Sequence, residues 1–150
     1  MKLNNHLRKA IIILLACFIM CAYPQPVHAA TGNYHIVPYH LNVDKCNVYF
    51  YVQNDVANII IDYFGKSSTF LRADVTVKIQ KRFLLTFWKD VDIGCANNEW
   101  KDSSIFLNGT FSQSFAVDGS GYYRALITVK FYGTTGVVDT VEFTEEFNYN

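Results

Sequence analysis

The sequence predicts an all-β protein, an antiparallel immunoglobulin-like β-sandwich of seven or eight strands. Three observations predict it. Apolar and polar residues alternate with a period of two in several runs along the chain, and no comparable window shows a helical period. Turn-forming residues separate the runs roughly every 8–12 positions. The length after the N-terminal segment suits one sandwich, with a small barrel as the alternative.

The individual runs follow one another in a regular order. Strands are expected at residues 47–52, 57–64, 72–80, 84–93, 104–107, 111–117, 122–131 and 137–147. In the clearest of them, residues 72–80, an apolar side chain stands at every second position. Glycines in the segments 118–121 and 133–136 supply the positive φ angles that tight connections need. Residues 31–45 are less regular and are expected to form an arm or an edge strand.

The first residues have the three parts of a secretory signal peptide in the usual order. Lys2, Arg8 and Lys9 form a basic start, and an uncharged apolar stretch covers residues 10–22. Small residues around Ala29 then offer a cleavage site. The stretch is shorter than the roughly 20 residues that span a bilayer. We therefore expect a signal peptide at residues 1–29 and one secreted, extracellular domain at residues 30–150.

One alternative to free release is lipidation. Leu14-Leu15-Ala16-Cys17 looks like a bacterial lipoprotein cleavage box, in which the cysteine receives the lipid. The residues that follow Cys17 are apolar, whereas a lipoprotein tether is normally polar. The sequence therefore favours Cys17 as an ordinary apolar residue of the signal peptide.

Composition and charge exclude several classes of protein. Hydrophobic residues make up 51% of the chain and charged residues 17%, with 13 basic and 13 acidic side chains. This balance excludes intrinsic disorder, a strongly basic nucleic-acid binder and a polybasic reader of membrane surfaces. Residues 30–150 carry a net charge of −3 and contain no apolar stretch long enough to be a transmembrane segment. No motif indicates a cofactor.

Two cysteines remain after residue 29, Cys46 and Cys95. In an oxidising compartment a lone pair most simply forms one disulfide. Closing a loop of about 50 residues would contribute up to roughly 4 kcal/mol in the chain-entropy model. A metal site is the weaker alternative, because two thiols without a nearby histidine pair do not complete four ligands.

Three groups of side chains could carry chemistry, and each is interpreted as part of the surface. They are Asp90 with Asp92 for calcium, His35 with His40 for a metal, and Glu142, Glu145 and Glu146 for glycoside hydrolysis. All stand on polar strand faces or in an extended segment, without a pattern that would bury or converge them. No Gly-x-Ser-x-Gly elbow, phosphate loop or zinc spacing is present. The sequence therefore does not predict an enzyme, and a secreted hydrolase is the remote reading.

Several short motifs resemble a group of small secreted proteins found chiefly in Gram-positive, clostridia-type bacteria and grouped as a domain of unknown function. The motifs are Pro38-Tyr39, Val75-x-Val77-x-Ile79-Gln80-Lys81, Trp88-x-x-Val91, Gly121-Tyr122-Tyr123-Arg124 and Glu142. The resemblance spans roughly residues 34–147 and implies a secreted immunoglobulin-like sandwich without an established activity. This chain departs from the group at Phe83-Leu84-Leu85, where a polar loop is usual, and in having Cys46 and Cys95.

A second resemblance concerns Gly121-x-Tyr123, which is similar to the tyrosine corner of immunoglobulin-type sandwiches. Trp88 could then be the core tryptophan of such domains. Its strand parity matches Asp90, however, whereas Phe87 and Val91 take the opposite parity. Either a bulge near Lys89 turns one side over, or Trp88 is exposed.

The aromatic residues are the remaining clue to function. Tyr49 and Tyr51 share one strand face, and with Trp88 they are the candidate ligand contacts. Clustered tyrosine and tryptophan side chains on a β-surface bind sugar rings or proteins, although Tyr49 and Tyr51 could equally be core residues. The sequence predicts a non-catalytic extracellular binding or interaction module, with a small carbohydrate-binding module as the alternative. Its partner would be an extracellular protein or a cell-surface glycan, and not a nucleic acid.

Overall fold

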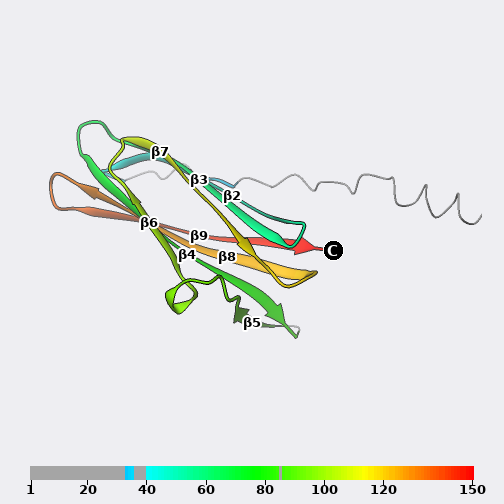
Figure 1. Ribbon diagram of the computed structural model, residues 1–150. Helices are drawn as coiled ribbons and strands as arrows, with labels where there is room; N and C mark the ends of the chain where they lie inside the picture. Colours follow the sequence, from blue (N-terminus) through cyan, green and yellow to red (C-terminus); the bar gives the residue numbers. More distant parts are fainter. Residues whose placement is uncertain (1–32, 36–39, 85) are drawn as a thin grey trace, which may run out of the picture.

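The computed structural model describes residues 33–35, 40–84 and 86–150, and it forms two antiparallel sheets packed face to face (Figure 1). The first sheet has the order β1-β2-β3-β7. Its strands are β1 (Asn33–His35), β2 (Val43–Gln53), β3 (Val56–Gly65) and β7 (Asn108–Ala116). The second sheet has the order β5-β4-β8-β9, and β6 also pairs with β4. Its strands are β4 (Phe70–Phe83), β5 (Phe87–Asp90), β6 (Trp100–Ser104), β8 (Gly121–Gly133) and β9 (Val138–Tyr149).

The two antiparallel sheets confirm the predicted all-β sandwich, although the described residues form nine strands rather than the expected seven or eight. The strands β2-β3-β7 follow the A-B-E order of the immunoglobulin fold, and β4-β8-β9 follow its C-F-G order. The short strands β5 and β6 lie along the same edge of β4, and a 3-10 turn (Ala96–Asn98) comes between them. The strand expected at residues 104–107 therefore lies earlier, at β6. The strand expected at 84–93 is the shorter β5, because Leu84 takes a positive φ of 56° and turns the chain.

The core lies between the two sheets, and every second residue of the central strands enters it. On β4, β8 and β3 these positions are almost fully buried, as the predicted alternation requires. At one end of the core the ring of Tyr63 stacks on Phe111, with a centroid distance of 5.4 Å, and lies 5.7 Å from Phe131 on the other sheet. The Tyr63 hydroxyl donates a hydrogen bond to Ser104 Oγ at 2.6 Å, and it lies 2.9 Å from the Phe106 carbonyl oxygen. Burial raises the pKa of Tyr63.

A polar clasp joins the start of β2 to the β8–β9 hairpin. Asn42 is fully buried, and its backbone N–H donates to Asp139 Oδ2 at 2.6 Å. The Asn42 side-chain amide donates to the carbonyls of Phe131 and Val137 at 3.2 and 2.9 Å. Gly133 makes room for this side chain, because a Cβ there would lie 1.9 Å from Asn42 Oδ1. The clasp therefore requires glycine at position 133.

Tyr123 at the start of β8 forms a tyrosine corner, the feature to which the motif Gly121-x-Tyr123 is similar. Its ring is fully buried, and its hydroxyl lies 2.6 Å from the carbonyl of Gly119 and 2.9 Å from that of Asp118. These acceptors stand four and five residues upstream, as in immunoglobulin-type sandwiches. The Tyr123 hydroxyl therefore holds the β7–β8 connection against the second sheet.

The predicted signal peptide at residues 1–29, including Cys17, lies outside the described residues. Among residues 33–35, 40–84 and 86–150, no helix is long and apolar enough to cross a membrane.

Replacement of Tyr123 by phenylalanine tests the tyrosine corner. Tyr123→Phe removes the buried donor to the carbonyls of Asp118 and Gly119, so we expect the free energy of unfolding to fall by about 1–2 kcal/mol. Urea denaturation followed by circular dichroism measures this, with an unchanged slope m. Tyr122→Phe is the matched control, because Tyr122 is 43% exposed and points outward. Equal stability of the two variants would contradict the assigned role.

Candidate binding surfaces

The outer face of the first sheet carries both tyrosines that the sequence singled out. Val48, Phe50 and Val52 point into the core, so Tyr49 and Tyr51 point outward on β2, where both are half-buried. This excludes the reading of the two tyrosines as core residues. Within the part of the chain that the structure describes, neither ring has a hydrogen bond, a stacking partner or a cation over it.

The neighbours of these rings are amides, hydroxyls, one carboxylate and one apolar side chain, Ile60, which lies opposite Tyr49. We call this surface the tyrosine face. It consists of Tyr49 and Tyr51 on β2, Asn58, Ile60 and Asp62 on β3, and Thr110, Ser112 and Ser114 on β7. Ser114 Oγ donates to Asn58 Oδ1 at 2.7 Å, and Thr110 Oγ1 donates to Asp62 Oδ1 at 2.7 Å. The hydrogen bonds orient these polar groups beside the rings.

A shallow depression of about 530 Å³ lies at one end of the tyrosine face. Tyr49 and Asn47 line it from β2, Asp62 from β3 and Thr110 from β7. Lys45 lies at its margin, with its ammonium 5.6 Å from the centroid of the Phe64 ring. The depression is open, so it suits an extended ligand lying along the sheet better than a small enclosed one.

Trp88 lies on the other side of the molecule, on β5 of the second sheet, so the structure does not bring it together with Tyr49 and Tyr51. Its ring is half-buried and points outward, because the guanidinium of Arg124 lies over it at 4.3 Å from the centroid. Trp88 is therefore not the core tryptophan of an immunoglobulin domain. Of the two alternatives for strand parity here, the structure shows an outward Trp88 and not a bulge near Lys89.

Two further arginines cover tyrosine rings on the same outer face. Arg82 lies 3.8 Å from the centroid of Tyr122, and Arg72 lies 4.3 Å from that of Tyr132. Such stacks are worth roughly 0.5–1 kcal/mol each at exposed sites. These stacks were not predicted from the sequence, although the matching outward parity of the arginines and tyrosines on neighbouring strands is a signal that could have suggested them. Together with the Arg124–Trp88 stack, they place a guanidinium over each of the rings of Trp88, Tyr122 and Tyr132.

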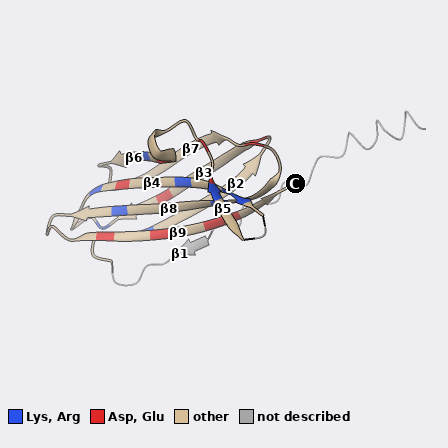
Figure 2. Cartoon of the chain, turned by 90° about the horizontal axis from the view of Figure 1, so that it is seen from below, with Lys and Arg blue, Asp and Glu red and all other residues tan. Residues whose placement is uncertain are grey.

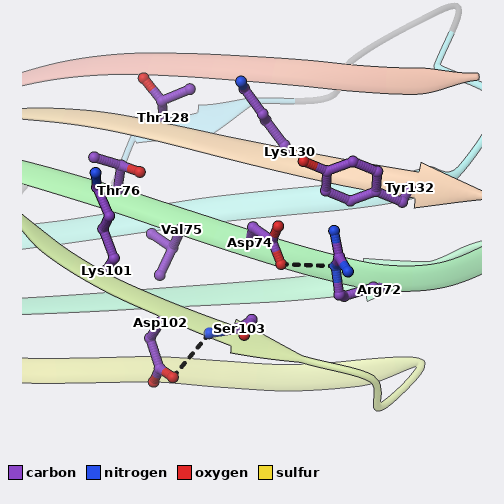
Figure 3. A pocket seen from close by; sticks show the side chains of 10 residues that line it. All are labelled: Arg72, Asp74, Val75, Thr76, Lys101, Asp102, Ser103, Thr128, Lys130 and Tyr132. Atoms are coloured by element: carbon purple, nitrogen blue, oxygen red, sulfur yellow. Dashed lines mark hydrogen bonds and ion pairs between the residues drawn. The ribbon is translucent and has the colours of Figure 1, made fainter.

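The outer face of the second sheet also has a depression, of about 460 Å³ (Figure 3). Side chains of β4, β6 and β8 line it, including Thr76, Lys101 and Lys130. Two of its charged groups pair with each other, since Arg72 Nε lies 2.9 Å from Asp74 Oδ1, and Lys101 pairs with Glu99 at 2.8 Å. Figure 2 shows basic residues on β4, β5 and β8 and acidic residues along β9. This face is therefore charged, in contrast to the tyrosine face.

Asp90 and Asp92, the calcium candidates, take different partners. Asp90 Oδ1 accepts from Gln80 Nε2 at 2.6 Å, and Asp92 Oδ1 accepts from the backbone of Gly94 at 2.9 Å. Among the described residues, no group of three or more histidine, cysteine, aspartate or glutamate side chains is placed to hold a metal ion.

The histidines and glutamates also do not converge. His40 Nδ1 lies 3.7 Å from Asp139 Oδ2, next to the clasp, whereas the side chain of His35 lies outside the described part. Glu142 and Glu146 are exposed on the outer face of β9, as their shared parity predicts, and Glu145 points inward. An inward charge on an edge strand opposes edge-to-edge aggregation.

The expected disulfide is not formed, and Cys46 and Cys95 are both free thiols. Cys46 is buried on β2, which packs along β9, whereas Cys95 follows β5 at the opposite edge of the second sheet. The prediction of a disulfide was wrong because the order of strands, which the sequence does not reveal, separates the two cysteines. Burial, with a smaller contribution from Asp62, raises the pKa of Cys46 to about 12.

Comparisons with known proteins found remote structural similarity only. No family model matches this chain, and no curated protein does. Similar solved structures include the crystal structure of wild-type OgpA from Akkermansia muciniphila, at 14% identity and a TM-score of 0.37, covering 86% of this chain and 32% of that one. Catalytically inactive OgpA in complex with an O-glycopeptide substrate (glycodrosocin) matches at 11% identity and a TM-score of 0.33, covering 85% and 33%. This chain thus spans about a third of the structures it matches, and a likeness this remote carries no information on function.

The two thiols should differ sharply in reactivity. The thiolate is the reacting form, so a pKa near 12 keeps Cys46 unreactive at pH 8, while half-buried Cys95 is alkylated. Of Cys46 and Cys95, mass spectrometry after iodoacetamide treatment should show only Cys95 labelled in the folded chain and both labelled after unfolding. Peptide mapping separates these labels from those on Cys17 and Cys21. Finding Cys46 and Cys95 in one disulfide-linked peptide would contradict the structure.

The same pKa predicts a pH dependence of stability. Above the unfolded pKa of 9.0 the unfolded chain releases the Cys46 proton, whereas the folded chain retains it up to about pH 12. The stability that this group contributes is therefore complete below pH 9 and is lost as the pH rises, by at most about 1.4 kcal/mol per pH unit. Chemical denaturation should show a shallower alkaline loss for Cys46→Ala than for the unchanged chain. Cys95→Ala should keep the full loss.

Proposed function

We propose that this chain is a secreted, non-catalytic binding module, and that the tyrosine face binds its ligand. One observation carries the proposal. Tyr49 and Tyr51 lie on the outer face of β2 without partners among the described residues, whereas arginines cover the rings of Trp88, Tyr122 and Tyr132 on the opposite sheet. Aromatic rings that lack internal partners on a surface suit ligand contact.

The chemistry of the face favours a neutral polysaccharide. Two rings on one strand, two residues apart, lie about 7 Å from each other along the chain. Sugar rings present apolar C–H faces to such aromatic rings and hydroxyls to their surroundings. Asn58, Ser112 and Thr110 supply amide and hydroxyl groups beside the rings, and Asp62 adds one acceptor. The small charge of the face gives an anionic ligand little attraction.

An extracellular protein is the second candidate partner. An exposed apolar residue, Phe64, is 44% exposed at the end of the tyrosine face, and it could extend a protein contact. We also propose that the chain belongs to the clostridia-type secreted family that its motifs resemble. Tyr123, one of the motif residues, supports this because its hydroxyl forms the tyrosine corner with the Gly119 carbonyl. Retention of a protein by the tyrosine face without saccharide binding would favour this second candidate.

Substitution of the two tyrosines tests the proposed ligand surface. The double variant Tyr49→Ala/Tyr51→Ala should weaken binding to any glycan that the chain retains on a glycan array by at least about tenfold, or about 1.4 kcal/mol. Titration calorimetry with the selected oligosaccharide measures this change.

The control replaces the same residue type on the other face. Tyr132→Ala removes a half-buried tyrosine of β8 and should leave glycan binding unchanged. Equal losses in the two proteins, or unchanged affinity of the double variant, would contradict the assignment to the tyrosine face.

The N-terminus of the exported protein tests secretion. Expression in a Gram-positive host should release a chain that begins at Ala30, as intact mass of the culture medium would show. Recovery in the membrane fraction with a lipidated Cys17 at the N-terminus would replace release by lipid anchoring. Retention of the full-length chain in the cells would contradict the signal peptide.

A further inference from the structure

The β4–β5 hairpin extends beyond the sandwich and exposes apolar side chains at its tip. Pairing of β4 with β8 ends at Lys81, so the last two residues of β4 have only β5 beside them. Phe83 and Phe87 face each other there and are 60% and 65% exposed, and Leu84 at the turn is 70% exposed. Figure 1 shows this hairpin at one end of the molecule, apart from the other strands.

These phenylalanines correct an expectation from the sequence. Their parity places Phe83 and Phe87 with Val91 on the core side, and Val91 does pack against the core. The hairpin ends outside the sandwich, however, so the rings of Phe83 and Phe87 stay more exposed than Val91 within the described chain. Three large apolar side chains on one projecting turn call for an explanation beyond the fold.

Behind the apolar tip the side chains are ordered by their distance from it. The next cross-strand pair is Arg82 with Trp88, the pair after it is Lys81 with Lys89, and the first acidic residue, Asp90, follows one pair later opposite Gln80. Leu84 at the tip is thus three residues from Lys81, which is about 10 Å along the strand. An interfacial segment buries its apolar part about 5–10 Å deep at the boundary of headgroups and acyl chains.

We propose that this hairpin tip inserts into the surface of an anionic lipid bilayer. Phe83, Leu84 and Phe87 would enter the acyl boundary, and Trp88 would lie at headgroup level, where amphipathic rings are favoured. Lys89 and Arg82 would then face the anionic headgroups. The proposal is independent of the tyrosine face, which belongs to the other sheet.

The charges around the tip favour this occupant. Residues 81–89 contain three basic side chains and no acidic one. The ammonium of Lys81 contacts the Asp118 carbonyl, and Asp90, Asp92 and Asp118 line a depression together with Lys81 and Lys89. Along the hairpin the first of these acids, Asp90, pairs opposite Gln80, so Arg82 and Lys89 stand between the acids and the apolar tip. The net charge of −3 for residues 30–150 excludes recruitment by overall charge. Attraction of this kind is local, within a Debye length of about 8 Å.

A second exposed apolar turn provides the contrast. Ile105 and Phe106, between β6 and β7, are 74% and 71% exposed. They follow Ser104, which pairs with Ala73 near the start of β4, at the far end from the hairpin. Residues 103–110 contain no charged side chain. This turn has comparable apolar exposure without the cations, and it therefore serves as the control.

Fluorescence of Trp88 tests the proposal on the full chain. Trp100→Phe leaves Trp88 as the single tryptophan and keeps an aromatic ring where Trp100 contacts Phe115. Vesicles of phosphatidylcholine with phosphatidylglycerol, brominated in the acyl chain near the headgroup, should quench Trp88 and shift its emission to shorter wavelength. Vesicles of phosphatidylcholine alone should do so much less. Because residues 10–22 can partition into lipid by themselves, the local signal of Trp88 is decisive rather than vesicle binding.

Variants in the same background separate the contributions. Phe87→Ser should weaken vesicle partitioning measured by Trp88 quenching about tenfold, and Lys89→Gln about fivefold. Phe106→Ser, at the opposite end, should leave it unchanged, and so should Tyr49→Ala/Tyr51→Ala. Circular dichroism confirms that each variant is folded.

Two results would overturn the proposal. An unquenched Trp88 on anionic vesicles would assign the tip to a protein partner instead. Equal losses for Phe87→Ser and Phe106→Ser would show that apolar exposure alone, without the basic residues, accounts for binding.

Discussion

Burial of alternate residues between two facing sheets is the constraint on which the remaining structure depends. A side chain at each second position of β2, β3, β4 and β8 is removed from water, and the apolar area buried there is the main stabilising contribution. The residues between them have no choice of direction. Val48, Phe50 and Val52 in the core therefore place Tyr49 and Tyr51 outside. A binding surface on this fold is the complement of its core.

Polar contacts then fix what hydrophobic burial leaves undetermined, namely how the connections close the sandwich. Asn42 reaches two carbonyls of the β8–β9 hairpin, and Tyr123 reaches two of the β7–β8 connection. Tyr63 ties the segment after β6 to the aromatic end of the core. Each of these groups is buried and hydrogen-bonded, so losing one partner costs more than a surface hydrogen bond would. The sheets supply stability, and these side chains supply the shape of the ends.

The sequence predicted the features that depend on local pattern. Fold class, most strands and the tyrosine corner at Tyr123 follow from alternation and turn residues within a few positions. Alternation placed Tyr49 and Tyr51 on one face, but only the structure shows that this face points outward. The exposure of Phe87 did not follow, because parity gives direction but not where the opposing strands stop. The separation of Cys46 from Cys95 depends on the order of strands, and the stack of Arg124 on Trp88 depends on register between strands far apart in the chain. Such pairings are set by the whole fold.

The clasp between Asn42 and Asp139 also makes the fold depend on contacts between distant parts of the chain. It joins residues 97 positions apart, and β9 pairs only with β8 while packing along β2. Neither sheet forms from contiguous sequence, because the chain leaves the first sheet after β3 and returns to it only at β7. Topologies with such distant contacts fold slowly, in milliseconds to seconds. The chain therefore needs β9, the last strand in sequence, before the clasp and the second sheet are complete.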